Sequence, residues 1–219
     1  MRFGHSIKGA ILDVDGVLLD SLGIWKDLGA KYLASQGIVP EASLGETLFS
    51  MSMEQGAEYL GKTYALDKTP AEIMDGLQGM LRDFYLYEVS PKEGAAELLS
   101  ALDAAGVRMA AATSSPREHV TAALERNGML PYVGRLLTNA EVGTSKHSPE
   151  IYDAAAEFLG FAKEQVCVFE DSLYALKTAA RAGYRTIGVF DKNGEPNQRG
   201  LEESAEVYVL NLKELQRLF

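Results

Sequence analysis

The sequence predicts an α/β protein, with a doubly wound, Rossmann-like parallel sheet as its core and a small α-helical domain inserted after the first strand. Two observations support this class. Short, almost continuously apolar runs recur along the chain, each followed by a turn and a helical pattern, which is typical of parallel strands buried on both faces. This rhythm is interrupted once, by helical segments with no strand between them. We therefore expect a core domain of residues 1–19 and 90–219 and a helical domain of residues 20–89.

The apolar runs are the predicted strands. They are "AILDV" at 10–14, "VRMAAAT" at 107–113, "RLLT" at 135–138, "VCVFE" at 166–170, "TIGVF" at 186–190 and "VYVL" at 207–210. In a doubly wound sheet the carboxyl ends of the strands lie at one edge, and ligands bind beyond that edge.

The helices between these strands carry their own start and stop signals. Segments 115–128 and 148–160 begin with Ser-Pro, and segment 171–183 begins with Asp. All three end in Gly, the residue that most readily ends a helix. The alternation of strand and helix therefore continues through the second half of the chain.

The inserted segment reads as helical throughout. Its three helical patterns lie at 21–37, 52–65 and 69–89, and the last begins with a Thr-Pro cap signal. A helical block that follows the first strand is expected over the carboxyl edge of the sheet, where a lid would sit.

Composition narrows the class of partner. The chain has 219 residues, with 31 acidic against 21 basic side chains and a formal net charge of -10, which argues against nucleic acid or an anionic membrane as a partner. Cys167 is the only cysteine, so an internal disulfide is excluded and a reducing compartment is favoured. The N-terminus has no apolar signal region and no window suits a membrane span. We expect a soluble cytoplasmic protein.

Paired carboxylates follow two of the predicted strands. Asp13 and Asp15 end the first strand, and residues two apart on a strand point the same way, so both can face one site. A turn would explain Asp15 with its following glycine, but not Asp13. Glu170 and Asp171 end another strand, where Asp171 could alternatively be a helix N-cap. Four converging acids would repel one another without a cation, and an oxygen ligand set suits Mg²⁺.

Two further strand ends offer groups that could bind an anion. Thr113 ends a predicted strand, and the amides of the turn after it precede a helix N-terminus. Helix capping alone would account for Ser115. Lys146 lies in the loop after strand 135–138, where it could balance the acidic cluster and bind a phosphoryl oxygen.

The order "DVDGV", "ATSS", "SK…PE" and "FEDS" resembles the four motifs of the haloacid dehalogenase superfamily. The helical insert after the first motif is similar to the cap domain of its beta-phosphoglucomutase-like phosphatases. The resemblance extends from residue 8 to about residue 190. Four motifs in the right order at the right strand ends make it specific.

The resemblance implies a role for each motif residue. Asp13 would attack phosphorus and form an aspartyl-phosphate, and Asp15 would be the general acid and base. Thr113 and Lys146 would hold the phosphoryl group. The implied metal ligands are Asp13, Asp15 (through its backbone carbonyl), Asp171 and Glu170. The implied substrate-binding residues are Ser114, Gly16, Trp25 and Met53.

The chain also departs from the family pattern. The usual Lys-Pro-x-Pro-Asp is replaced by "KHSPE" at 146–150, which puts the rigidity of this loop and the role of His147 in question. Trp25 stands where beta-phosphoglucomutases carry a histidine, and Met53 stands near their phosphate-binding arginine. Lys62 or Arg82 could compensate for these losses.

The function that these residues indicate is Mg²⁺-dependent hydrolysis of a small phosphorylated metabolite, by a monomer without nucleic acid or membrane partners. A beta-phosphoglucomutase-type isomerase shares the same core and differs only in what accepts the phosphoryl group. A phospho-acceptor signalling domain also groups aspartates, a hydroxyl and a lysine, but the long helical insert argues against it. A dehalogenase would need neither Asp15 nor a metal.

Overall fold

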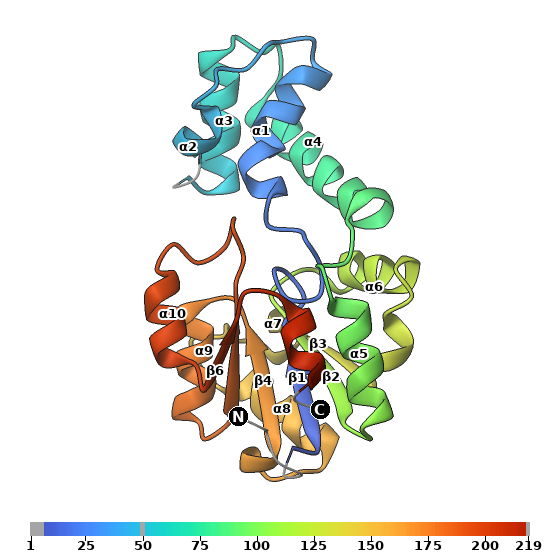
Figure 1. Cartoon of the computed structure of the whole chain (residues 1–219). Helices are drawn as coiled ribbons and strands as arrows, with labels where there is room; N and C mark the ends of the chain where they lie inside the picture. The colour runs from blue at the N-terminus through green and yellow to red at the C-terminus, as the bar shows by residue number, and fades with distance from the viewer. Residues whose placement is uncertain (1–6, 49–50, 218–219) are drawn as a thin grey trace. The chain divides into compact units, whose positions relative to one another are not determined.

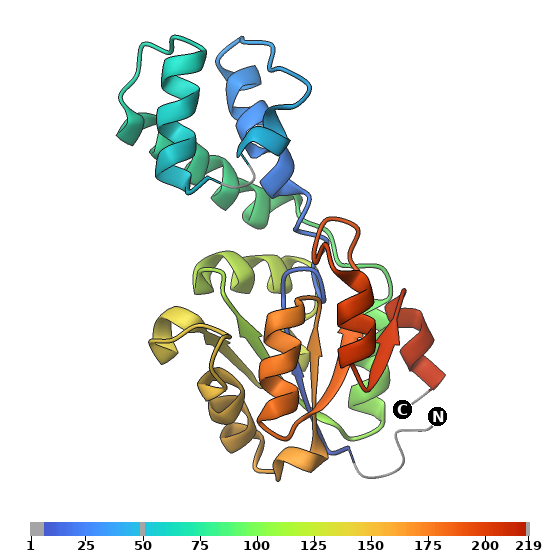
Figure 2. The same ribbon diagram turned by 90° about the vertical axis from the view of Figure 1, so that its left-hand side faces the viewer.

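The computed structural model describes residues 7–48 and 51–217, and the chain divides into two compact units (Figures 1 and 2). The core unit consists of Met1–Ser21 and Val89–Phe219, and the helical unit is Leu22–Glu88. The helical unit thus starts two residues later and ends one residue earlier than the insert expected from the sequence.

The core unit contains one parallel six-stranded sheet with the order β3-β2-β1-β4-β5-β6. Its strands are β1 (Gly9–Leu12), β2 (Arg108–Thr113), β3 (Arg135–Thr138), β4 (Val166–Glu170), β5 (Arg185–Val189) and β6 (Val207–Val209). This confirms the predicted fold class and each predicted strand. From β1 the chain moves outward to β2 and β3 and then returns to β4 on the other side of β1. The strand order therefore reverses between β1 and β4, the position at which sheets of this class bind ligands.

Helices lie on both faces of this sheet (Figures 1 and 2). They are α5 (Ala95–Ala104), α6 (Arg117–Arg126), α7 (Asn139–Val142), α8 (Glu150–Leu159), α9 (Leu173–Arg181) and α10 (Gln198–Ser204). Right-handed crossovers place α5 and α6 on one face and α8, α9 and α10 on the other. Ile151, Ala155 and Leu159 of α8 pack against Ile11 and Val168 of the central strands in one buried cluster.

Glycines end all three helices whose stops the sequence signals, each with a left-handed backbone. Gly128 follows α6 with φ of 69°, Gly160 ends α8 with φ of 77°, and Gly183 follows α9 with φ of 96°. Only glycine adopts this conformation without steric cost, so these stops are encoded locally. α7 and α10 are not expected from the sequence, because helices of four and seven residues are too short to show an amphipathic period.

The helical unit contains α1 (Ile24–Ser35), α2 (Leu44–Leu48), α3 (Met53–Thr63), α4 (Pro70–Asp83) and a π-helical turn (Phe84–Glu88). Ser52 and Thr69 each accept a hydrogen bond from the backbone N–H three residues on, in complete capping boxes. The predicted helical segments are thus present, and the short α2 is an additional helix that the sequence pattern does not reveal.

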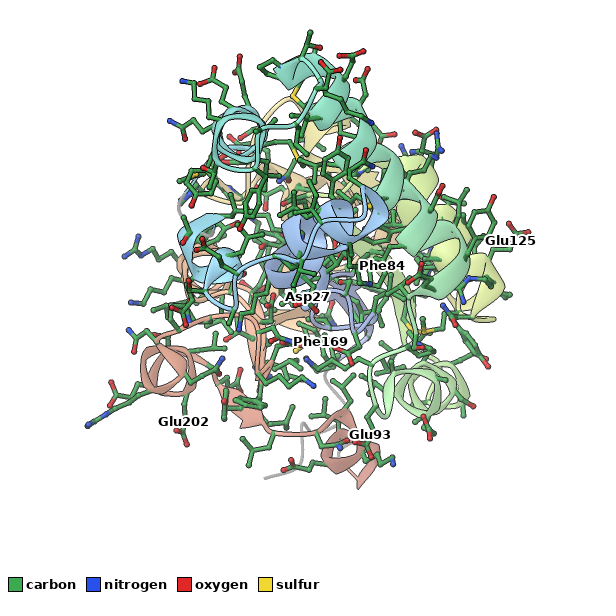
Figure 3. All side chains as sticks on the ribbon, turned by 90° about the horizontal axis from the view of Figure 1, so that it is seen from above. Asp27, Phe84, Glu93, Glu125, Phe169 and Glu202 are labelled. Carbon is green, nitrogen blue, oxygen red and sulfur yellow. The ribbon has the colours of Figure 1, made fainter. Side chains whose placement is uncertain are left out.

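Figure 3 shows the side chains of both units. Glu125 of α6 and Glu202 of α10 are exposed and lie at the periphery of the view, whereas Phe169 of β4 is fully buried in the sheet. Within the described ranges, no helix combines the length and apolarity that crossing a bilayer requires.

Candidate active site

Asp13 follows β1 directly and remains attached to the sheet. Its backbone N–H donates to the carbonyl of Phe169 in β4 (3.0 Å), and the residue is only 7% exposed. Gly16 then turns the chain with φ of 81°. A turn therefore explains Asp15 and Gly16, in line with one of the hypotheses from the sequence. It does not explain the buried carboxylate of Asp13.

Lys146 brings a buried positive charge to the ends of two adjacent strands. Its Nζ lies 2.6 Å from Asp13 Oδ1 and 2.7 Å from Glu170 Oε1, and the residue is 3% exposed. Burial alone would lower the pKa of this lysine, but the two carboxylates outweigh that effect and hold its pKa above the ordinary value. Lys146 therefore remains charged and balances the acidic groups beside it.

Three of the four predicted acids converge. Carboxylate oxygens of Asp13, Glu170 and Asp171 all lie within 4.8 Å of one another, and the three residues are buried. Such a set of hard oxygen donors fits a divalent cation such as Mg²⁺. Burial raises the pKa of Asp13 well above its ordinary range, and burial together with Glu170 raises the pKa of Asp171 to about 7. A bound cation would compensate for both effects.

The expectation that the Asp15 carboxylate joins this group is not met. Its two oxygens accept hydrogen bonds from Ser21 Oγ (2.6 Å) and Ser115 Oγ (2.7 Å). The physical reason is that two hydroxyl donors from other parts of the core unit, Ser21 and Ser115, satisfy its oxygens. The two aspartates therefore differ in their hydrogen-bond donors: Asp13 accepts from the Lys146 ammonium, and Asp15 accepts from two hydroxyl groups.

The residues after β2 form a compact hydroxyl-rich turn. Thr113 is fully buried, and its Oγ1 accepts the backbone N–H of Ser115 (3.0 Å). Ser114 is exposed, and its Oγ accepts a hydrogen bond from Asn139 Nδ2 (2.8 Å). The capping alternative for Ser115 is wrong, because the N-cap of α6 is Pro116 and Ser115 bonds Asp15 instead.

The capping alternative for Asp171 is also wrong. The N-cap of α9 is Ser172, which makes no side-chain cap bond, and the N–H of Leu173 donates to Glu195 Oε2 instead (3.0 Å). Asp171 thus has no capping role and belongs to the acidic cluster.

The loop that carries Lys146 is held together by its own side chains. Thr144 Oγ1 and Ser148 Oγ are 2.6 Å apart, and the N–H of Ser148 donates to the carbonyl of Ser145 (3.1 Å). The exposed ring of His147 stacks on Tyr174 of α9 with 4.3 Å between ring centroids. These contacts restrain a loop that lacks the first proline of the family pattern.

Trp25 and Met53 lie in the helical unit. Both line a cavity of about 130 Å³ within that unit, together with apolar side chains of α1, α3 and α4. The walls are mostly apolar, so a group that binds there would be recognised by shape and dispersion rather than by charge.

Sequence reasoning misses four residues of the site. Ser21 and Ser115 both donate to Asp15. Asn139 donates to Ser114, and Tyr152 donates to Glu170. Ser21 and Ser115 lie within or next to the motifs, but their role as donors to Asp15 is evident only from the structure. Tyr152 lies in the buried stripe of α8 and reads as a core residue.

The raised pKa of Asp171 predicts a pH dependence of stability in the metal-free protein. In the folded state Asp171 keeps its proton up to about pH 7. In the unfolded chain its pKa is near 3.8, so the proton is released at a lower pH. This contribution to the free energy of unfolding is complete below pH 3.8 and is lost as pH rises through 7. We expect a loss of about 1 kcal/mol between pH 6 and pH 8 in urea titrations with chelator. The loss should be smaller in Asp171→Asn, and an equal loss in both proteins would contradict the assignment.

Comparison with known proteins agrees with this fold. Residues 7–183 match the model of the haloacid dehalogenase-like hydrolases, and the chain belongs to this family. This establishes the class of enzyme as a hydrolase. Among individual proteins, it is similar to validoxylamine A 7'-phosphate phosphatase of Streptomyces hygroscopicus subsp. limoneus, with 28% identity over 187 residues that cover 83% of this chain and 85% of the relative.

Two solved structures are also similar. One is a HAD family hydrolase from Deinococcus radiodurans R1, solved with bound phosphate and sodium. It has a TM-score of 0.77 and 25% sequence identity, and the match covers 96% of this chain and 94% of the Deinococcus chain. A Thermotoga maritima structure described as a candidate beta-phosphoglucomutase has a TM-score of 0.86, 22% identity and coverage of 97% and 98%. At 22% identity, the similarity to the Thermotoga structure is evidence for the fold alone.

Proposed function

We propose that the protein is a Mg²⁺-dependent phosphatase that hydrolyses a small phosphorylated metabolite through an aspartyl-phosphate intermediate. The observation that carries this proposal is the position of Asp13. Its carboxylate lies at the end of a central strand, 2.6 Å from a buried lysine and within 4.8 Å of two further acids. The phosphatase relative and the phosphate-bound family structure support the same reaction class.

The acidic group would hold the cation through carboxylates of Asp13, Asp171 and Glu170, with the backbone carbonyl of Asp15 as a further ligand. When bound, Mg²⁺ screens the negative charge of the phosphate from that of the carboxylates. This removes the repulsion that would otherwise keep a phosphate ester away from Asp13.

In the first step, a carboxylate oxygen of Asp13 forms a bond to phosphorus while the bond from phosphorus to the ester oxygen breaks. Asp15 donates a proton to the departing oxygen. In the second step, Asp15 takes a proton from water, the water oxygen forms a bond to phosphorus, and the bond from phosphorus to the Asp13 oxygen breaks. Inorganic phosphate leaves and both carboxyl groups return to their initial state.

Lys146 and Thr113 would bind the phosphoryl group during both steps. The Lys146 ammonium has a third N–H beyond those bonded to the two carboxylates and can donate it to a phosphoryl oxygen. Thr113 Oγ1 accepts from Ser115 and so keeps its own hydroxyl hydrogen for donation. Ser114 and Gly16 are proposed to complete the phosphate contacts.

Asp15→Asn tests the separation of roles. One serine hydroxyl can still donate to the amide oxygen, the other can accept from the amide N–H, and the backbone carbonyl is unchanged, so metal affinity should be preserved. Proton transfer is lost, and we expect kcat to fall by about 10² to 10⁴. Calorimetric titration with Mg²⁺ and steady-state kinetics measure the two effects separately. Loss of metal binding with retained kcat would reverse the assigned roles.

The substrate is proposed to be selected by the helical unit, acting as the cap domain, with Trp25 and Met53 among its substrate contacts. Phosphate release from a panel of phosphorylated metabolites, with Mg²⁺ and with excess chelator, tests the function directly. Activity that persists in chelator would contradict it.

The isomerase alternative requires its own experiment. Incubation with beta-glucose 1-phosphate, a bisphosphate primer and Mg²⁺ should release inorganic phosphate faster than it forms glucose 6-phosphate. The reason is that Trp25 and Met53 replace polar groups that a mutase uses. Faster formation of glucose 6-phosphate would favour the mutase.

A further inference from the structure

Tyr152 contacts the acidic cluster from inside the core. It lies on α8, is fully buried, and donates its hydroxyl to Glu170 Oε1 at 2.8 Å. Lys146 Nζ donates to the same oxygen at 2.7 Å. Both donors thus meet on one oxygen of Glu170, and neither of them bonds Oε2.

The hydroxyl of Tyr152 is not needed for packing. Its ring packs in the buried cluster formed by α8 and the sheet, where a phenylalanine ring would occupy the same space. The hydroxyl adds a single buried O–H group, which must find an acceptor, and its acceptor is a carboxylate of the acidic cluster. Burial, and then Glu170, raises the pKa of Tyr152 above its ordinary value, so the phenol remains a donor.

A carboxylate held on one oxygen by two donors has a fixed orientation. Side chains around metal ligands that make such bonds orient the ligand and hold its charge in place, and their loss typically weakens metal binding or activity by about 10- to 100-fold. We propose that Tyr152 is a positioning residue that fixes Glu170 so that its second oxygen is presented to the cation. This inference rests on the proposed metal-dependent function.

The core unit contains a matched control. Tyr184 packs against Tyr152 with 6.2 Å between ring centroids and donates its hydroxyl to Asp153 Oδ1 at 2.6 Å. Lys163 Nζ is bonded to the same Asp153 oxygen. Each tyrosine therefore shares a carboxylate oxygen with a lysine, but only the carboxylate bonded by Tyr152 belongs to the acidic cluster.

The experiment compares Tyr152→Phe with Tyr184→Phe, using Mn²⁺ as a spectroscopic probe whose free concentration is read by electron paramagnetic resonance. We expect the dissociation constant of Mn²⁺ to rise by about 10-fold or more in Tyr152→Phe and by less than about twofold in Tyr184→Phe. At saturating Mg²⁺, kcat of Tyr152→Phe should return to within a few-fold of the wild-type value. Circular dichroism of both variants confirms that they are folded.

A double-mutant cycle shows whether Tyr152 acts through Glu170. In a Glu170→Gln background, Tyr152→Phe should change Mn²⁺ affinity by less than about twofold. An unchanged Mn²⁺ affinity in the single variant, or an undiminished effect in the Glu170→Gln background, would overturn the positioning role while leaving the proposed function intact. Absence of Mn²⁺ binding by the wild-type protein would overturn both.

Discussion

Replacing Asp13 with asparagine is expected to lower kcat for phosphate release by about 10³-fold or more, because the amide is not a nucleophile. The amide oxygen can still accept from Lys146 Nζ, which lies 2.6 Å from the carboxylate in the wild-type protein, so the local structure should be retained. The backbone hydrogen bond from Asp13 N–H to the Phe169 carbonyl does not involve the side chain and should still connect β1 to β4 in the variant. Steady-state kinetics with an aryl phosphate and Mg²⁺ measure the effect.

Asp153→Asn is the control for this variant. Asp153 is also a carboxylate paired with a lysine, but it lies at the surface on α8 and outside the acidic cluster. The activity of the Asp153→Asn variant should remain within about twofold of the wild-type value. Acid-quenched mass spectrometry adds a second readout, since the phosphorylated peptide should contain Asp13 and should be missing in Asp13→Asn. Turnover in Asp13→Asn close to the wild-type rate would exclude the aspartyl-phosphate mechanism.

Replacing Lys146 with alanine is expected to lower the free energy of unfolding by about 3–5 kcal/mol in metal-free protein, because two buried carboxylates then lose their common counter-charge. The ammonium is 2.6 Å from Asp13 and 2.7 Å from Glu170, and its side chain is 3% exposed. Activity should fall as well, since the phosphoryl group loses a cationic partner. Urea unfolding with chelator present measures the stability change.

Lys163→Ala is the matched control for the lysine. Its Nζ lies 2.5 Å from Asp153, but the side chains of the pair are 39% and 43% exposed, so solvent screens the interaction. A surface pair of this kind contributes about 0–1 kcal/mol. Adding Mg²⁺ should restore part of the stability lost in Lys146→Ala, because the cation neutralises the same carboxylates. Equal destabilisation by the two alanine variants would show that the buried ion pairs of Lys146 contribute no more to the free energy of unfolding than the exposed pair of Lys163.

Local patterns are sufficient to predict the architecture of the core unit. The strands are recognisable because a strand covered on both faces must be apolar almost throughout, and the interrupted rhythm reveals the insert. Gly160 and Gly183 mark helix ends because a left-handed backbone strongly favours glycine. Short helices such as α2 and α7 escape prediction, since one turn or so of helix is stabilised by its tertiary surroundings rather than by its own sequence.

The motifs alone are enough to assign Asp13, Lys146, Glu170 and Asp171 to the same edge of the sheet, because parallel strands bring their carboxyl ends together. Their mutual distances do not follow from the motifs in the same way. The Asp15 carboxylate accepts hydrogen bonds from Ser21 and Ser115, and the motifs do not identify these partners.

The sequence by itself determined the order of the strands along the chain, the place of the insert and the residue types at each strand end. Only the tertiary structure decided which of those residues share a hydrogen bond. Tyr152 illustrates the difference: its spacing on α8 assigns it to the core, and its hydroxyl acquires a role only because Glu170 ends β4, a strand that follows α8 in the chain and packs beside it. A periodic pattern reports which face of an element is buried, whereas a polar atom on that face is positioned by whatever distant part of the chain folds against it.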